Sequence, residues 1–500
     1  MASATRAGFA LIAQNPYLLG VASFSTLGGL LFGYDQGVVS GVGTMQSLGA
    51  RFPRVYADTN FKGWFVSTLL LAPWFGSLIN GPIVDRLGRK VSINIAVVIF
   101  VIGPAIQSGR AIADVAIGQL TMVVPLYISE LDLIHPVSIT LGILISYWLD
   151  YGTNYIGGTR CAPSIPYTGG TSSSRTFDPY TDIPRDGHCT SQSEASWRLP
   201  LALQILPAII LGLGILFFPD SPRWLLMRAR DDDALKALSR LRQEQDLQAP
   251  RLVDEYLEIK ASVMWENGLV RERFNGLVGW RRHVAQYTSL ITTWSHFKRL
   301  TIGSCVMFFQ QFMGCNDGNT TSLLATGVYG IINTLSTLPA LFLIDRLGRR
   351  PLLMCGAAGT CISLVIVGGL IGATPIGWVL PSEIFNLSIR SKAISITTSA
   401  TWMCNFIIGL VTPDMLDSIT WGTYIFFAAF CLLAFGFTFF FIPETRGKTL
   451  EGMDLIFGDT AAHEEKRSII QIEAQLRATH DQLIDRNFLK PIAQEDENAK

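Results

Sequence analysis

Charge is absent from six long stretches of this 500-residue chain. No Asp, Glu, Lys or Arg occurs in Gly63–Val84, Val91–Gly109, Leu199–Pro219, Gly318–Ile344, Ala393–Pro413 or Ser418–Pro443. A helix needs about 20 predominantly apolar residues to cross the ~30 Å core of a bilayer. Six runs of about this length predict an all-α integral membrane protein and exclude a soluble enzyme.

A further uncharged run, Ala7–Tyr34, lies near the N-terminus. No small-residue cleavage site follows a short apolar core there, so the run is expected to be a first membrane span and not a removable signal peptide.

The composition narrows the classes of function. Only 16% of the residues are charged, whereas soluble proteins carry about 25%. Lys plus Arg and Asp plus Glu balance at 39 each, so the net charge indicates no nucleic-acid partner. The six histidines are scattered, and no cluster of metal ligands or nucleophile constellation is visible. We therefore expect no metal and no cofactor, and the sequence implies no oligomer.

The basic residues predict the orientation of the chain. Fourteen of the 39 Lys and Arg residues fall between Arg223 and Arg299, and eight more follow Pro443. Basic residues near helix ends favour the cytoplasmic side. Both termini are then cytoplasmic, and twelve spans form two sets of six. The expected parts are an N-terminus (1–16), a first half (17–219) with an outer loop (153–197), a cytoplasmic helical linker (220–299), a second half (300–443) and a tail (444–500).

Three pairs of short motifs recur in the two halves. DRLGR occurs at Asp85–Arg89 and again at Asp345–Arg349. The matched pairs that accompany it are PDSPRWLL (Pro219–Leu226) with PETRGKTLE (Pro443–Glu451), and Ser129–Glu130 with Ser382–Glu383. One copy would indicate only a basic turn at the membrane surface. Paired copies at matching positions predict an internal repeat, which is typical of secondary transporters with a substrate site between their halves.

The motifs also resemble those of a known family, the sugar porters of the major facilitator superfamily, particularly the fungal monosaccharide transporters. The matching text is GGLLFGYDQGVVSG (Gly28–Gly41), both DRLGR copies, VVPLYISE (Val123–Glu130), PDSPRWL, FFQQFMGCN (Phe308–Asn316), PSEIF (Pro381–Phe385) and PETRGKTLE. The resemblance implies the major facilitator fold, alternating access in the plasma membrane, and transport of a hexose or pentose, often coupled to protons.

An acidic residue, Asp35, interrupts the first apolar run. An intramembrane carboxylate is a functional candidate by default. The resemblance implies that Asp35 carries the coupled proton and pairs with Arg110 of the fourth span. The alternative is that Asp35 only lies at the outer interface.

A sugar site needs neutral donors and acceptors together with an aromatic face. Gln310, Gln311 and Asn316 offer amides within two helical turns of one another. Further residues that match sugar-site positions of the family are Asn333, Trp378, Trp402 and Asn405. Helix–helix packing is the alternative role for each. It stays open for Trp402 and Asn405.

Charged residues at the helix ends are expected to form a cytoplasmic gate. The resemblance implies that Arg86, Arg89, Arg346, Arg349 and Arg390 pair with Glu130, Glu383, Asp220 and Glu444. Asp85, Asp345 and Arg223 lie in the same motifs and are counted with them. Isolated surface pairs contribute only ~0–1 kcal/mol, so solvation is the alternative and a network is the more credible latch.

Two cysteines, Cys161 and Cys189, fall in the predicted outer loop. That space is oxidising, so a disulfide between them is possible, whereas the other six cysteines are expected to be packing residues.

At four places the chain also lacks sequence segments that the family normally has. These are Gly109–Arg110, the stretch after Glu130, Asn316–Asp317 and Gly372–Trp378. The last is the most severe, because two full spans need about 40 residues and Pro351–Ser382 is shorter. Two functions therefore remain open: a proton-coupled or facilitative monosaccharide transporter, and a transport-dead relative or sugar receptor of the same fold.

Overall fold

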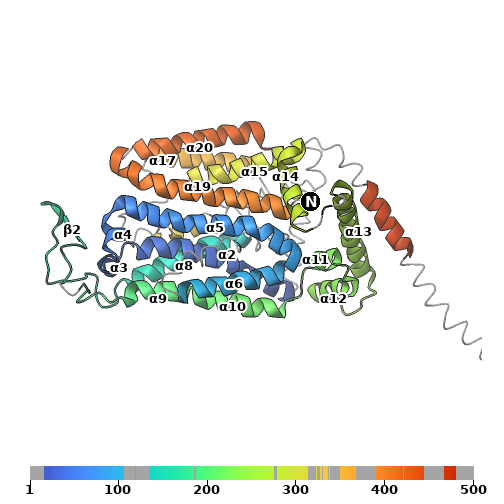
Figure 1. The fold of residues 1–500 in the computed structure, drawn as a ribbon, viewed down its shortest axis with the longest axis horizontal. Coiled ribbons are helices and arrows are strands. Elements are labelled where there is room, and N and C mark those ends of the chain that lie inside the picture. Colours follow the sequence, from blue (N-terminus) through green and yellow to red (C-terminus); the bar gives the residue numbers. More distant parts are fainter. Residues whose placement is uncertain are drawn as a thin grey trace, which may run out of the picture.

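The computed structural model describes residues 16–105, 119, 134–184, 187–274, 277, 279–313, 323, 327–328, 330–335, 337, 349–366, 390–419, 422–443 and 467–479. Its long helices lie side by side in two layers, with the first half of the chain in one layer and the second half in the other (Figure 1). Helices α11–α13 and the two short strands lie at opposite ends of these layers (Figure 1). We name these ends the linker end and the loop end.

The helices of the first half are α2 (Pro16–Val42), α3 (Gln46–Arg51), α4 (Pro53–Ala57), α5 (Thr59–Leu87), α6 (Arg89–Ala105), α8 (Ile134–Thr153), α9 (Ala195–Leu203) and α10 (Ile205–Phe217). The linker forms α11 (Pro222–Met227), α12 (Asp231–Arg242), α13 (Pro250–Arg273) and α14 (Trp280–Thr292). The second half forms α15 (Trp294–Met313), α17 (Arg349–Ile366), α19 (Arg390–Ile419) and α20 (Gly422–Phe441). A further helix covers residues 467–479.

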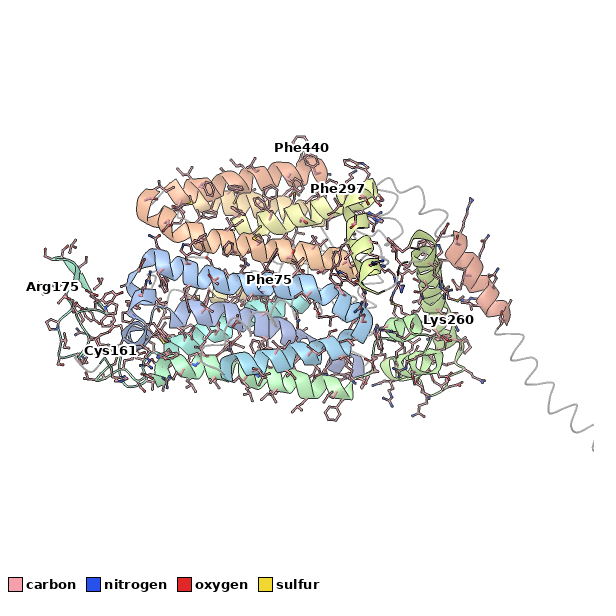
Figure 2. The ribbon with its side chains drawn as sticks, in the orientation of Figure 1. Phe75, Cys161, Arg175, Lys260, Phe297 and Phe440 are labelled. Carbon is pink, nitrogen blue, oxygen red and sulfur yellow. A yellow bond between two sulfur atoms is a disulfide. The ribbon has the colours of Figure 1, made fainter. Side chains whose placement is uncertain are left out.

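Four helical stretches of the described chain are each long and apolar enough to cross a membrane. They are Asn60–Leu87, Ala195–Phe217, Arg390–Thr412 and Gly422–Phe441. Each overlaps one of the uncharged runs in the sequence. Large apolar side chains are exposed along them, including Phe75 of α5 and Phe440 of α20 (Figure 2). Such exposure is expected where lipid and not water surrounds a helix.

Helices α2 and α8 pack at very close range in the first half. Glycines recur every four residues along α2 at Gly33, Gly37 and Gly41, so they share one face of the helix. A Cβ atom at Gly33 would overlap the backbone carbonyl oxygen of Ile139 in α8. Small residues let membrane helices approach in this way, and van der Waals contact then stabilises the pair.

The two halves meet along α5 and α19, which pack together over their length. Near the linker end, the Ser395 hydroxyl donates to the carbonyl oxygen of Ser77 over 2.6 Å. Near the other end, the side-chain nitrogen of Asn60, when it faces α19, lies 3.1 Å from Oδ2 of Asp414. A second seam joins α8 to residues 330–335, where the Thr334 hydroxyl donates to the Thr140 carbonyl oxygen over 3.2 Å.

A compact polar loop closes the loop end. Strands β1 (Gly169–Thr171) and β2 (Ser174–Thr176) form a small hairpin, and a disulfide joins Cys161 to Cys189 (Figure 2). Asp182 accepts hydrogen bonds from the backbone N–H groups of Thr168 and Asp178. Burial alone would raise the pKa of Asp182, but hydrogen bonds from Thr168, Asp178 and Thr181 together outweigh it and lower that pKa.

The linker helices form a small module with its own core of Leu225, Leu226, Ala234, Ala237 and Val263. Helix α12 begins with three aspartates and has Arg240 and Arg242 in its last turn, which suits the helix dipole at both ends. Ser221 and Pro222 occupy the cap and first helical positions of α11, but the Ser221 hydroxyl makes no capping bond.

Candidate functional site

Helix α19 carries two of the residues expected to line a sugar site. The Trp402 side chain is buried, with 2% of its surface exposed, and Asn405 is also buried. Residues three apart lie on neighbouring positions of one helix face. Since α19 packs against both α15 and α5, this face lies inside the protein.

Two buried donors on this face have no hydrogen-bond partner among the described residues. They are Nε1 of Trp402 and Nδ2 of Asn405. A buried donor without a partner costs about 1–3 kcal/mol. Both atoms are neutral, as a site for hydroxyl groups requires. The pair is therefore suited to an uncharged polyol ligand.

Phe32 of α2 connects this face to the other half of the protein. Its ring lies 5.3 Å from the Trp402 ring, measured between centroids, in an edge-to-face arrangement. Asp35 follows one turn later on α2 and is buried, with 7% of its surface exposed. Phe32 was not singled out in the sequence, although it lies within the motif GGLLFGYDQGVVSG that contains Asp35.

The amides of α15 lie near the same helices. Gln310 is buried and Gln311 is half-buried, and α15 packs directly against α19. Asn333 is half-buried in the helical stretch 330–335, where its backbone carbonyl accepts from the Thr337 hydroxyl. Three residues predicted for the site or for proton coupling lie outside the described residues: Arg110, Asn316 and Trp378.

At the linker end, Asp85 of the first DRLGR copy forms an ion pair across the two halves. Its Oδ2 lies 2.7 Å from Nζ of Lys392, near the start of α19. Only 4% of the Lys392 side chain is exposed, against 25% of the Asp85 side chain. Lys392 was missed in the sequence, although it immediately precedes the uncharged run Ala393–Pro413. Removal of one partner from a buried ion pair leaves the other charge uncompensated, which strongly destabilises a protein.

Helix α14 lies against this ion pair. Nε of Arg86 donates to Nε2 of His283 over 3.2 Å, so that nitrogen acts as an acceptor. Burial lowers the pKa of His283, as do the charges of Lys392, Arg86 and Arg282, against an opposing effect of Asp85. His283 therefore favours its neutral form beside the gate. Tyr287, one turn later, donates to the Leu78 carbonyl oxygen of α5 over 3.3 Å.

The rest of the first DRLGR copy holds the linker module in place. Gly88 has φ of +88°, and a Cβ there would lie 2.9 Å from the Trp224 ring, so only glycine fits without strain. Arg89 donates to the Ser221 hydroxyl over 3.3 Å. The Ser221 oxygen thus accepts from Arg89, and it accepts no capping bond from the backbone of α11.

The other predicted gate residues are distributed as follows. Arg223 pairs with Glu266 inside the linker module at 2.7 Å. Asp220 and Arg390 are half-buried, and Arg349 is the first residue of α17. The gate residues that lie outside the described chain are Glu130, Asp345, Arg346, Glu383 and Glu444.

Comparisons with solved structures define the class of protein. The structure of the proton:xylose symporter XylE, a major facilitator protein from E. coli, covers 88% of this chain and 99% of its own, with a TM-score of 0.64 and 24% identity. A partially occluded inward-open structure of XylE gives a TM-score of 0.62. The chain thus has the fold of these major facilitator structures.

Sequence comparisons then define the family. Residues 21–373 and 358–457 match the family described as sugar (and other) transporter, and the chain belongs to it. An MFS glucose transporter of Aspergillus flavus is 30% identical over 522 residues, with 89% of this chain and 90% of the relative covered. A probable quinate permease of the same species is 28% identical, with coverage of 95% and 94%.

These matches also bear on the sequence segments that the chain lacks. The alignment with the quinate permease extends over 554 positions, which exceeds the 500 residues of this chain. The relative therefore contains internal segments that this chain lacks. The family match also comes in two pieces that meet at residues 358–373, beside the shortened stretch Gly372–Trp378.

Proposed function

We propose that this protein carries a monosaccharide across the membrane by alternating access between its two halves, in symport with protons. The observation that carries the proposal is the pair of buried neutral donors, Trp402 Nε1 and Asn405 Nδ2, beside the contact with Phe32. Sugar hydroxyl and ring oxygens would accept from both donors. Gln310, Gln311, Asn316, Asn333 and Trp378 would complete the site.

Proton coupling is proposed to depend on Asp35. Protonation of Asp35 would release the predicted partner Arg110, and Phe32 lies one turn from Asp35 and touches Trp402. Sugar and proton would thus act on the same segment of α2. Asp85 and Lys392 would hold the linker end closed while the opposite side is open. The proposed orientation places the linker and both termini in the cytoplasm, in the plasma membrane.

A second candidate function is a transport-dead relative or sugar receptor. It is favoured by the internal segments that the quinate permease has and this chain lacks. Such a protein would bind sugar at the same face of α19 without moving it, so binding and transport must be measured separately.

Sugar binding is tested by the thermal stabilisation of purified protein in D-glucose or D-xylose, because a ligand of the folded state raises Tm by an amount that grows with the logarithm of its concentration relative to Kd. We expect Asn405→Leu to weaken the affinity about 5- to 150-fold, through loss of one hydrogen bond worth roughly 1–3 kcal/mol.

The matched control is Thr412→Val. Thr412 lies on the same helix, and its buried hydroxyl also lacks a partner among the described residues. This variant is expected to leave the sugar affinity unchanged. Stabilisation by quinate instead of either sugar, or equal effects of the two substitutions, would refute the proposed site.

A further inference from the structure

Two faces of helix α14 have different surroundings. It lies crosswise to the membrane helices at the linker end (Figure 1). Its inner face carries His283, Tyr287 and Leu290, at spacings of four and three residues. Leu290 is fully buried with Leu300 of α15 and Ala393 of α19. This face therefore packs against the gate.

The outer face of α14 is exposed although it is apolar. Val284 of this face is 44% exposed, and Trp280 and Ile291, which lie at its border with the inner face, are 67% and 62% exposed. Trp294, which begins α15, is 75% exposed. A hollow of about 550 Å³ lies on this face, and the residues that line it are Phe274, Leu277, Trp280, Arg281, Val284, Ala285, Thr288, Ser289 and Thr292.

The position of this face indicates what covers it. Helix α15 follows α14 almost directly, and Phe297 of its first turn lies at the edge of the bundle beside α14 (Figure 2). Tryptophan is enriched where membrane proteins cross the boundary between lipid and water. A helix with this arrangement lies in the interface, with its apolar face among acyl chains.

The charged residues of the segment 273–299 indicate which kind of lipid would bind there. Residues 273–299 contain five Lys or Arg residues and no Asp or Glu, and three of the five, Arg281, Arg282 and Lys298, are exposed, whereas Arg299 is fully buried. Among the residues that line the hollow, Arg281 carries the charge, and Arg282 beside it is exposed. Clusters of basic residues on an interfacial helix attract anionic lipid headgroups, with about 1 kcal/mol for each Lys or Arg.

We propose that the outer face of α14 binds an anionic phospholipid, with its phosphate at Arg281 and an acyl chain along Leu277, Trp280 and Val284. The inner face of the same helix holds Arg86 and α5 through His283 and Tyr287. A bound lipid thus fixes α14 against the gate. This site goes beyond sugar transport. Only the assignment of the lipid to the cytoplasmic leaflet rests on the orientation proposed above.

The test uses full-length protein in two kinds of phosphatidylcholine nanodisc. One kind contains brominated phosphatidylserine and the other contains the same fraction of brominated phosphatidylcholine, with the bromine on the acyl chains in both. Bromine quenches nearby tryptophan fluorescence, and the contribution of Trp280 is the difference between the unaltered protein and Trp280→Phe. We expect brominated phosphatidylserine to quench Trp280 more than brominated phosphatidylcholine does. Arg281→Gln should reduce this preference by about fivefold, the equivalent of ~1 kcal/mol.

Arg251→Gln is the matched control, because Arg251 is an exposed arginine of α13 and does not line the hollow. It should leave the preference for phosphatidylserine unchanged. Equal quenching by the two brominated lipids would show that the face has no preference for an anionic headgroup and would overturn the proposal. Absence of quenching by either lipid would place the face in water and would also overturn it.

Discussion

Asp35→Asn is expected to abolish proton-driven accumulation of sugar while leaving sugar exchange intact. A pH difference of one unit is worth 1.36 kcal/mol, so symport with one proton can concentrate a sugar about tenfold. Asparagine keeps the shape of the carboxylate but cannot take up a proton. The accumulation ratio in proteoliposomes should therefore fall from about 10 to about 1.

The control for this substitution is Asp232→Asn, which removes an exposed carboxylate in the first turn of α12. It is expected to leave the accumulation ratio unchanged. If the Asp35→Asn protein still concentrates sugar in response to the pH difference, Asp35 does not carry the proton.

Asp85→Asn is expected to destabilise the closed linker end strongly. The Lys392 ammonium is almost fully buried, and its carboxylate partner would be gone. Breaking a buried ion pair by removing one partner typically costs about 3–5 kcal/mol. Lys392→Met should cost less, since the Asp85 carboxylate that it leaves is partly exposed to solvent. In the double variant much of the loss should be recovered, with a coupling energy of roughly 1–3 kcal/mol. Unfolding free energies of the four proteins measure this cycle.

A pair in the same protein serves as the comparison. Arg242 and Glu255 lie 2.5 Å apart on the linker module, with about a third of each side chain exposed. Glu255→Gln should cost less than about 1 kcal/mol, because exposed pairs are screened by water. A cost for Asp85→Asn no larger than that for Glu255→Gln would show that the Asp85–Lys392 pair is not a latch.

The sequence predicted the membrane class and the family because both depend on short sequence segments. Uncharged runs of about 20 residues require helices in lipid, and the repeated motifs have a fixed order. A helical linker between the two halves was likewise expected. These features need no knowledge of which helices pack together.

The partners at the gate and at α14 could not be predicted in the same way. Lys392 meets Asp85 only because α5 and α19 pack across the two halves, and nothing near either residue in the chain indicates that packing. Phe32 meets Trp402 for the same kind of reason. His283, Tyr287 and Leu290 of α14 follow a visible helical spacing, but the sequence does not say that their face lies against the gate.

The central claim is that this chain moves a monosaccharide, and uptake by the unaltered protein tests it most directly. Purified protein is reconstituted in liposomes with a higher pH inside, and the entry of labelled D-glucose and D-xylose is followed over time. We expect at least one sugar to accumulate above its external concentration, and a protonophore to abolish this excess. Saturable binding of both sugars, without entry in either the presence or the absence of the pH difference, would contradict transport and support a sugar receptor.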